Sequence, residues 1–405
     1  MTRPSILYLA HRTPYPPNKG DRIRSFNVLK HLSRYAAVHL ACFADDSESE
    51  GAIDALHRYC DRVAIVRLDR RRWLRAAASF ARGRSVSEGA FRSPQMTDIV
   101  RTWGRQIRFA AAIASASSMA RYLRLPELGE ARRIVDFVDV DSRKWLDYAE
   151  ADVGPRSWLY RAEARRVREL ERDAAEHSAA CMVVSEREAD LARQHCPGDA
   201  IHIVPNGVDL DYFTPQPEAQ EQICVFVGAL DYRPNVDAAC WFCDRVWPSV
   251  RERYPSAAFH LVGRRPVRAV RTLSRLPGVH VAADVQDVRP HIAHATAAVV
   301  PLRIARGIQN KVLEAMAMGK AVITSPQSIA GLDVDPDAHV LCAATDGEWV
   351  AAISRTFDDA RLRRQLGFEA RRYVEQNHCW ERCLEPLDAL LGIESMELQG
   401  ACCAT

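Results

Sequence analysis

The 405-residue sequence lacks any uninterrupted apolar run of the roughly 18 residues that a membrane-spanning helix requires. It also lacks the apolar core of a secretory signal, because the first apolar stretch, residues 6–10, is short, and Pro16-Pro17 and charges follow at once. That stretch is better explained as a buried first strand. We therefore expect a protein that stays in the cytoplasm, with at most a peripheral contact to a membrane.

Metal-binding patterns are missing as well, although twelve cysteines are present. The pair Cys240 and Cys243 forms a C-x-x-C motif within a helical pattern, and no second pair follows at the spacing of zinc ligands. We interpret the cysteines as reduced thiols that pack like small apolar residues. The sequence accordingly predicts no metal ion and no cofactor.

Positive charge is concentrated in the first half of the chain. Up to Pro205 there are 34 Lys and Arg residues against 27 Asp and Glu, whereas the remainder is net acidic. The excess is mostly arginine and is densest at residues 67–84. No aromatic-interleaved or zinc-finger pattern supports nucleic acid as a partner. An anionic membrane surface, a phosphate-bearing acceptor and a merely solvated helix face all agree with this charge.

Short apolar runs alternate with longer helical patterns, and the alternation occurs in two series along the chain. Continuous apolar strands separated by helices form parallel sheets that are covered on both faces, so each series predicts a doubly wound α/β domain. Helices are expected at 22–32, 53–59, 94–108, 158–177, 236–254, 309–318 and 360–391. Strands are expected at 6–10, 38–43, 63–68, 110–114, 134–138, 180–184 and 201–204, and then at 224–228, 258–262, 279–282, 297–301 and 321–324.

The junction between the two series is marked by turn chemistry. Pro205-Asn206-Gly207 has the composition of a turn, and a stretch rich in Pro and Glu follows at 215–222. We expect a first domain at 1–215 and a second at 216–375. A final helix that crosses back to the first domain, with a disordered tail, is expected at 376–405.

Four segments of the sequence resemble family 4 of the retaining glycosyltransferases, namely 11–25, 135–142, 204–209 and 301–319. They occur in the family's order and at the expected strand ends, and the likeness covers nearly the whole chain. Within the family, the chain is most similar to the sugar transferases associated with PEP-CTERM/exosortase exopolysaccharide systems. The resemblance implies a GT-B fold, in which two Rossmann-like domains face a central cleft, and retention of the anomeric configuration.

The last of these segments contains the strongest candidate site. Gly307 opens a loop before a helix, and a helix start offers unpaired N–H groups and the positive end of a dipole, which suit a diphosphate. Arg303, Arg306 and Lys311 add positive charge around this start. The resemblance implies that Glu314 accepts hydrogen bonds from the ribose hydroxyls of a nucleotide.

Two departures from the family pattern affect the donor side. Arg306 stands where many members have the first of two glutamates, so contacts with the donor sugar are expected to shift to the backbone at Ile308 and Gln309. The basic pair that often follows the strand at 224–228 is absent, and Arg233 is expected to supply part of that charge.

Two further strand ends complete the expected donor side. Gly263 ends the strand that begins at residue 258. The backbone around Val285, after the next strand, is expected near the nucleotide base.

The acceptor side is expected in the first domain. Gly20 permits a tight loop that approaches the donor, and Asp21 is expected to help bind the acceptor, with a plain helix cap as the alternative. Asp139 follows an apolar strand, where α/β proteins place ligands, and is expected to face the acceptor and the sugar. Asp139 and Asp141 also match the D-x-D pattern of metal-dependent transferases, and this alternative stays open.

The sequence thus predicts a retaining glycosyltransferase that moves a sugar from a nucleotide diphosphate sugar to a glycan or polyprenyl-linked acceptor in cell-surface polysaccharide assembly. Its partners would be these two substrates and, through the arginine-rich first domain, the cytoplasmic face of the inner membrane, but no nucleic acid. Catalysis would rest on positioning and on stabilisation of the leaving diphosphate. A sugar-nucleotide 2-epimerase of the same fold and an inactive scaffold subunit are the alternatives.

Overall fold

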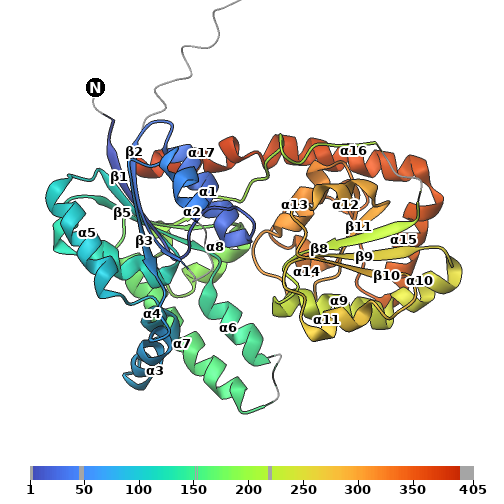
Figure 1. Ribbon diagram of the computed structural model, residues 1–405, viewed down its shortest axis with the longest axis horizontal. Helices are drawn as coiled ribbons and strands as arrows, with labels where there is room; N and C mark the ends of the chain where they lie inside the picture. The colour runs from blue at the N-terminus through green and yellow to red at the C-terminus, as the bar shows by residue number, and fades with distance from the viewer. Residues whose placement is uncertain (1–2, 45–49, 151, 153, 218–220, 393–405) are drawn as a thin grey trace, which may run out of the picture. The chain divides into compact units, whose positions relative to one another are not determined.

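The computed structural model describes residues 3–44, 50–150, 152, 154–217 and 221–392 (Figure 1). The chain divides into two compact units: unit 1 comprises Met1–Pro205 and Leu384–Thr405, and unit 2 comprises Asn206–Cys383. The division therefore falls within the Pro-Asn-Gly turn rather than near residue 215. The tail that we expected to be disordered lies outside the described residues.

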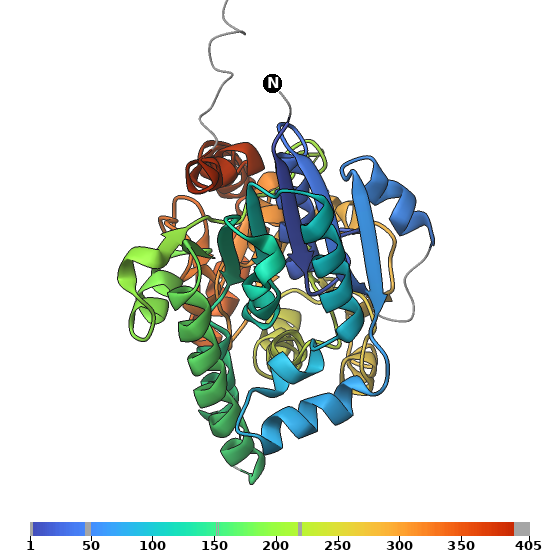
Figure 2. The same cartoon turned by 90° about the vertical axis from the view of Figure 1, so that its left-hand side faces the viewer.

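Unit 1 is built on a seven-stranded parallel sheet with the order β3-β2-β1-β4-β5-β6-β7. The strands predicted for the first series are confirmed, because continuous apolar runs indicate strands that are buried on both faces. Helix α5 lies against one face of this sheet (Figure 2). The strands are β1 (Ser5–Ala10), β2 (Ala37–Ala44), β3 (Arg62–Arg67), β4 (Ala111–Ser115), β5 (Arg132–Val138), β6 (Ala180–Val183) and β7 (Ile201–Ile203).

The helices of unit 1 connect successive strands. The last helix, α17 (Trp380–Leu391), begins in unit 2 and ends in unit 1, where Asp388 accepts hydrogen bonds from His31 and Tyr35. The other helices are α1 (Gly20–Leu32), α2 (Glu50–His57), α3 (Arg72–Ala81), α4 (Val86–Ala90), α5 (Pro94–Gln106), α6 (Asp141–Glu150), α7 (Arg156–Glu176) and α8 (Glu186–Arg193), with the short 3-10 helices η1 (Ser117–Arg124), η2 (Pro126–Leu128) and η3 (Gly198–Ala200).

Unit 2 repeats this arrangement with a six-stranded parallel sheet of order β10-β9-β8-β11-β12-β13. Helices α9 and α11 lie on one side of the sheet and α12 and α13 on the other (Figure 1). Its strands are β8 (Ile223–Val227), β9 (Ala258–Gly263), β10 (Val279–Ala283), β11 (Ala297–Val300), β12 (Ala321–Thr324) and β13 (Leu341–Cys342). Its helices are α9 (Arg233–Arg245), α10 (Trp247–Arg253), α11 (Arg268–Leu273), α12 (Arg289–His294), α13 (Asn310–Ala317), α14 (Pro326–Ile329), α15 (Asp346–Asp358) and α16 (Ala360–Asn377).

The prediction of one helix at 236–254 is wrong, because two helices, α9 and α10, meet at Val246. Pro248 in the first turn of α10 has no N–H group to continue the hydrogen-bond ladder of α9. The break places the Trp247 ring 5.5 Å from that of Phe259. None of the described helices combines the length and the apolar character that spanning a membrane requires.

A buried ion pair joins α1 to the centre of the unit 1 sheet. The Arg24 guanidinium donates two hydrogen bonds to Asp136 of β5, at 2.7 and 2.9 Å, and both side chains are only 1% exposed. The same guanidinium donates to the carbonyl of Val204, just after β7, at 2.8 Å. Charged groups at this depth are tolerated because each is paired and hydrogen-bonded.

Replacing Asp136 with alanine should therefore destabilise the protein strongly, because Arg24 would keep a buried charge without its counter-ion. We expect a loss of about 3–5 kcal/mol in the free energy of unfolding. Urea unfolding followed by circular dichroism measures it. Asp173→Asn is the matched control, because its pair with Arg124 is 46% exposed on both sides and should contribute no more than about 1 kcal/mol. Equal losses in the two variants would contradict the prediction.

Candidate functional site

Four loops meet at the carboxyl edge of the unit 2 sheet. They follow β8, β9, β10 and β11, and β8 lies between β9 and β11 in the sheet. The chain leaves β8 toward β9 on one side and later returns to β11 on the other, so this is the topological switch point of the sheet. Open α/β sheets bind their ligands outside the carboxyl ends of the strands at such a point.

Two glycines bring these loops close together. A Cβ atom at Gly263 would lie 1.7 Å from the Gly228 carbonyl oxygen, so only glycine fits where β8 and β9 end. A Cβ atom at Gly228 would lie 3.1 Å from Lys311 Nζ and 2.7 Å from Asn235 Nδ2. The absence of side chains at both positions therefore leaves room for a lysine from α13 beside the end of β8.

Lys311 is a partly buried cation at the switch point. Its Nζ donates to Asn235 Oδ1 at 2.5 Å and lies 4.7 Å from the centroid of the Phe226 ring. Burial lowers the pKa of Lys311 to about 7, although the nearby Glu314 carboxylate opposes this shift. Asn235 was not among the predicted site residues, although it is a polar side chain in the first turn of the helix after β8.

Glu314 lies one turn further along the same helix. Burial raises the pKa of Glu314 to about 7, and the charge of Lys311 opposes this shift. In the described part of the chain, we find no group that donates a hydrogen bond to this carboxylate. Its two oxygens are thus available to accept hydrogen bonds from hydroxyl groups of a ligand.

The loop before α13 exposes the start of that helix. Gly307 has a φ of +54°, and Gln309 Nε2 donates to the Arg306 carbonyl at 2.6 Å. Ile308 is buried, and the side chain of Gln309, the N-cap residue, makes no capping hydrogen bond to the helix start. The buried Nδ2 of Asn310 likewise has no acceptor within the described ranges. We did not single out Asn310 from the sequence, although it lies between two predicted site residues.

The remaining donor-side candidates surround this point. Arg233 begins α9, and Val285 follows Asp284, whose carboxylate accepts a hydrogen bond from the backbone of Arg265 at 2.8 Å. Arg303 donates two hydrogen bonds to Asp237 of α9, at 2.9 and 2.5 Å. Its charge is therefore already offset by a carboxylate that was not among the predicted site residues.

Unit 1 carries the other three predicted site residues, Gly20, Asp21 and Asp139. Gly20 and Asp21 form the first turn of α1, after the loop that follows β1. Asp21 lies 3.4 Å from His11 Nε2 and 3.2 Å from the Arg12 guanidinium. Burial would raise the pKa of Asp21, but the hydrogen bond and charge of His11, together with Arg12, hold it well below its usual range. Asp21 is thus an ionised carboxylate that lies next to His11 and Arg12, and neither neighbour was predicted from the sequence.

Asp139 has a strained backbone on its N-terminal side. Val138, the last residue of β5, has a φ of +65°, which is rare for a β-branched residue, and the Asp139 N–H donates to the Phe137 carbonyl at 2.8 Å. This tight turn directs the chain out of the sheet toward α6. Strain of this kind persists only where the surrounding structure imposes it.

Two buried glutamates hold the chain just after this turn. Glu188 accepts a hydrogen bond from the Val140 N–H at 2.7 Å, and Glu171 accepts from the N–H and the hydroxyl of Ser142 at 3.0 and 2.6 Å. Burial and the repulsion of Glu188 raise the pKa of Asp139 to about 7, and Lys144 opposes this shift.

The D-x-D pair of the metal-dependent alternative lies in this same segment. Asp141 is the first residue of α6, and one of its oxygens lies 3.8 Å from Lys144 Nζ. Across the described ranges, no group of three or more His, Cys, Asp or Glu side chains is arranged to hold a metal ion.

Comparison with known families identifies the second unit. Residues 221–359 match the model of a family described as glycosyl transferases group 1. The match contains every predicted site residue of unit 2. Residues 221–359 are thus a group 1 glycosyltransferase domain, and the class of protein that this domain and the fold define is a glycosyltransferase. No curated protein matches the chain at a significant level.

Solved structures share the architecture of the whole chain. The sucrose-phosphate synthase of Thermosynechococcus elongatus is similar over 96% of this chain and 98% of its own, with a TM-score of 0.72 and 17% identity. Anabaena HepE in complex with UDP follows with 96% and 99% coverage, a TM-score of 0.67 and 12% identity. The UDP-forming trehalose-phosphate synthase of Burkholderia vietnamiensis has the same coverage and identity at a TM-score of 0.62. At these identities the likeness shows the fold, and that fold is GT-B.

The raised pKa of Asp139 has a measurable consequence for stability. Between the unfolded value of about 3.9 and the folded value of about 7, the folded state keeps a proton that the unfolded state has lost, so this group's contribution to stability falls as pH rises through that window. Asp139→Asn should remove this loss, and the variant should gain on the order of 2–4 kcal/mol relative to wild type between pH 4 and pH 8.

Urea unfolding at several pH values measures this difference. Asp141→Asn is the control, because it changes a neighbouring carboxylate that is 40% exposed. The assignment fails if both variants alter the pH dependence equally.

Proposed function

We propose that the protein is a retaining glycosyltransferase that transfers a hexose from a nucleoside diphosphate sugar to a glycan or polyprenyl-linked acceptor. The observation that carries the proposal is the pair Lys311 and Glu314, partly buried on α13 at the switch point of unit 2. The proposal includes a cytoplasmic location and a role in exopolysaccharide or other cell-surface polysaccharide assembly, as the sequence resemblance implies.

The donor diphosphate would bind at the start of α13. The N–H groups around Ile308 and Gln309 and the helix dipole suit an anion, and Gly307 allows the backbone to approach it. Lys311, whose charge is costly to bury, would gain a counter-ion there. Arg306 and Arg233 would add positive charge at the rim, whereas Arg303 would contribute less because Asp237 already neutralises it.

The nucleoside would lie beyond the diphosphate along the same edge of the sheet. The Glu314 carboxylate would accept hydrogen bonds from the two ribose hydroxyls, and the backbone at Val285 and Gly263 would lie near the base. Support for a uridine nucleotide comes from the likeness to Anabaena HepE, whose structures are in complex with UDP and with UDP-glucose.

The chemistry would consist mainly of electrostatic stabilisation. As the bond between the sugar and the diphosphate breaks, negative charge grows on the leaving group, and fixed positive groups that need no reorganisation lower the barrier. Lys311 and the helix start would serve this purpose without a metal cofactor. On the acceptor side, the ionised Asp21 can accept a hydrogen bond, and Asp139 can exchange a proton near neutral pH. Gly20 would keep the start of α1 open.

Glu314→Gln should weaken binding of the donor nucleotide while the fold stays intact. Glutamine keeps the size of the side chain but loses charge-assisted hydrogen bonds to the ribose, which should cost about 1.5–3 kcal/mol of binding free energy. Titration calorimetry with a panel of nucleoside diphosphates measures it. Glu252→Gln, which changes an exposed glutamate on α10, is the control. If Glu314→Gln binds nucleoside diphosphates as tightly as wild type, Glu314 does not bind the ribose.

Metal dependence separates this mechanism from the alternative that uses Asp139 and Asp141. With fixed positive groups on α13, excess chelator should leave transfer activity within about a factor of two, which corresponds to roughly 0.4 kcal/mol of barrier. Loss of activity that manganese or magnesium restores would overturn the metal-free mechanism. The same assay without acceptor tests the other candidates, because an epimerase would release an altered nucleotide sugar and a scaffold would leave the donor unchanged.

A further inference from the structure

Helix α3 turns its apolar side outward. Trp73 and Leu74 are 62% and 72% exposed, and Ala77 and Ala81, on the same side of the helix, are exposed as well. Ala76, on the opposite side, is buried. A surface helix ordinarily directs its apolar stripe to the core and its polar side to water. The orientation of α3 is the reverse.

Polar contacts fix α3 in this orientation. Arg75 pairs with Asp69 at 2.9 Å, and the Ser79 hydroxyl donates to the Ser85 carbonyl at 2.9 Å. Phe80 lies beneath the guanidinium of Arg166 from α7, at 3.7 Å from the ring centroid. The inward side of the helix is therefore occupied, and the apolar side is left to solvent.

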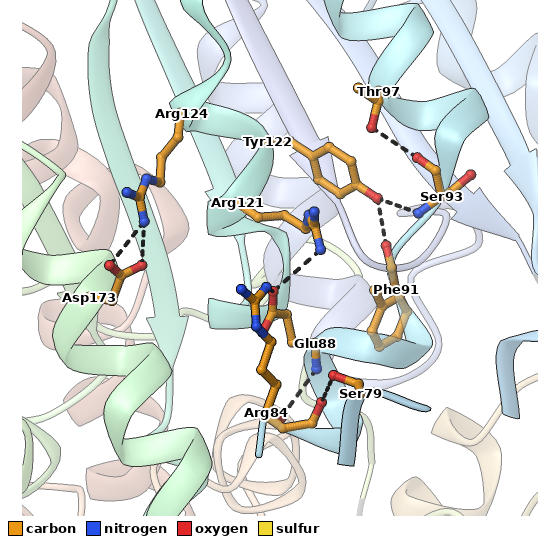
Figure 3. A network of polar contacts seen from close by, with 11 residues as sticks. Ser79, Arg84, Glu88, Phe91, Ser93, Thr97, Arg121, Tyr122, Arg124 and Asp173 are labelled. Atoms are coloured by element: carbon orange, nitrogen blue, oxygen red, sulfur yellow. Dashed lines mark hydrogen bonds and ion pairs between the residues drawn. The ribbon is translucent and has the colours of Figure 1, made fainter. Parts of the chain in front are cut away.

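The following helix, α4, attaches this segment firmly to the body of unit 1. The buried carboxylate of Glu163 in α7 accepts hydrogen bonds from the Ser85 hydroxyl at 2.8 Å and from the N–H groups of Val86 and Ser87 at 2.9 and 3.0 Å. Glu88 pairs with Arg84 and with Arg121 of η1 (Figure 3). The C-terminal end of α3 and the start of α4 are thus bound to α7 and η1, so the exposed Trp73 and Leu74 belong to an anchored helix.

Arginines surround this apolar face. Residues 67–84 contain seven arginines and one acidic residue, Asp69. Arg70, Arg71 and Arg82 are exposed beside the helix. The face thus combines an exposed tryptophan and leucine with a strong positive charge.

A second patch of the same kind begins α7. Trp158 and Leu159 are 70% and 42% exposed, and Arg156 and Arg161 are exposed around them. In both views, α3 and the first turns of α7 lie at one end of unit 1, the end toward which its parallel strands run (Figures 1 and 2). Asp139, which follows β5, lies on that same side of the sheet.

We propose that α3 and the first turn of α7 form one surface that binds an anionic lipid bilayer. Tryptophan is favoured at the boundary between headgroups and acyl chains, and arginines beside it are attracted to anionic headgroups. The outward apolar face of α3 would enter that boundary. The inference rests on the proposed function in one respect, because a polyprenyl-linked acceptor would reach Asp139 from the bilayer.

The observations favour a bilayer over other occupants. A single-stranded nucleic acid is bound by aromatic rings that line a basic groove, and the apolar side of Leu74, Ala77 and Ala81 has no counterpart in such a ligand. A second copy of the chain would bring two clusters of seven arginines together, which like-charge repulsion disfavours.

Vesicle binding by the full-length protein tests the proposal. We expect at least tenfold stronger partitioning, by sedimentation, onto vesicles of phosphatidylglycerol and phosphatidylcholine than onto phosphatidylcholine alone, decreasing with added salt. The double variant Trp73→Ser/Leu74→Ser and the double variant Arg70→Gln/Arg71→Gln should each lower this partitioning about tenfold. Vesicles with brominated acyl chains should quench tryptophan fluorescence, and Trp73→Phe should remove part of the quenching.

Matched controls lie on α16 of unit 2. Phe368 is 65% exposed, and Phe368→Ser should leave partitioning unchanged, as should Arg361→Gln/Arg364→Gln. The proposal is overturned if wild-type protein does not prefer anionic vesicles or if the α16 variants lose as much binding as the α3 variants. It is equally overturned if the α3 variants lose only RNA binding or self-association, measured by sedimentation velocity.

The donor assay keeps this inference separate from the proposed function. Nucleotide affinity should be the same in the α3 variants and in wild type, which also confirms that the variants fold. Vesicle binding without any sugar transfer would contradict the proposed function but not the bilayer-binding surface. Sugar transfer without vesicle binding would contradict the bilayer-binding surface but not the proposed function.

Discussion

The partial burial of one lysine determines how the carboxyl edge of the unit 2 sheet is built around α13. An ammonium group that leaves water needs compensation, and Lys311 receives it from the Asn235 amide oxygen, the face of the Phe226 ring and the Glu314 carboxylate. Glycine at position 228 leaves the space in which these groups meet. The compensation is incomplete, because the pKa of Lys311 is still lowered to about 7. An anionic ligand is the partner that would complete it.

In unit 1, the pKa values of two carboxyl groups are shifted in opposite directions. Asp21 lies between His11 and Arg12 and is held in its ionised form, whereas burial and Glu188 favour the protonated form of Asp139. The strain at Val138 and the two glutamates that anchor the chain after it indicate that the position of Asp139 is imposed by its surroundings.

The same end of unit 1 carries the outward apolar face of α3. Exposed tryptophan and leucine side chains reduce solubility, so a helix in this orientation is costly in water alone. The contacts of Glu163 and Arg166 hold it in place. Together with Asp139 on that side of the sheet, this arrangement would allow a lipid-linked acceptor to reach the protein from the surface that carries it.

Much of the fold could be predicted because each strand of a parallel sheet has a pattern of apolar residues that can be recognised within a short stretch of sequence. Strands that are buried on both faces are continuous apolar runs, so all strands but β13, which has two residues, were recognisable. The break at Val246 was not, because the apolar pattern of a helix continues through Trp247 and only Pro248 indicates an interruption. Lys311 was recognisable as a cation at the start of a helix that follows a strand end and a glycine, whereas the candidate role of Glu314 came from the family resemblance.

Only the tertiary structure decided which residues from distant segments contact the candidate site residues. Asn235 contacts Lys311, and Asp237 contacts Arg303, because β8 and β11 are neighbours in the sheet. The sequence of a single strand does not specify which strands lie next to it. His11 and Arg12 next to Asp21, and Glu188 next to Val140, depend on packing in the same way. Sequence alone showed that the segment that forms α3 is rich in arginine, but it did not lead us to predict a helix there. Which of its faces meets water depended on contacts with α4 and α7, because amphipathicity defines two sides of a helix but not the direction in which either one points.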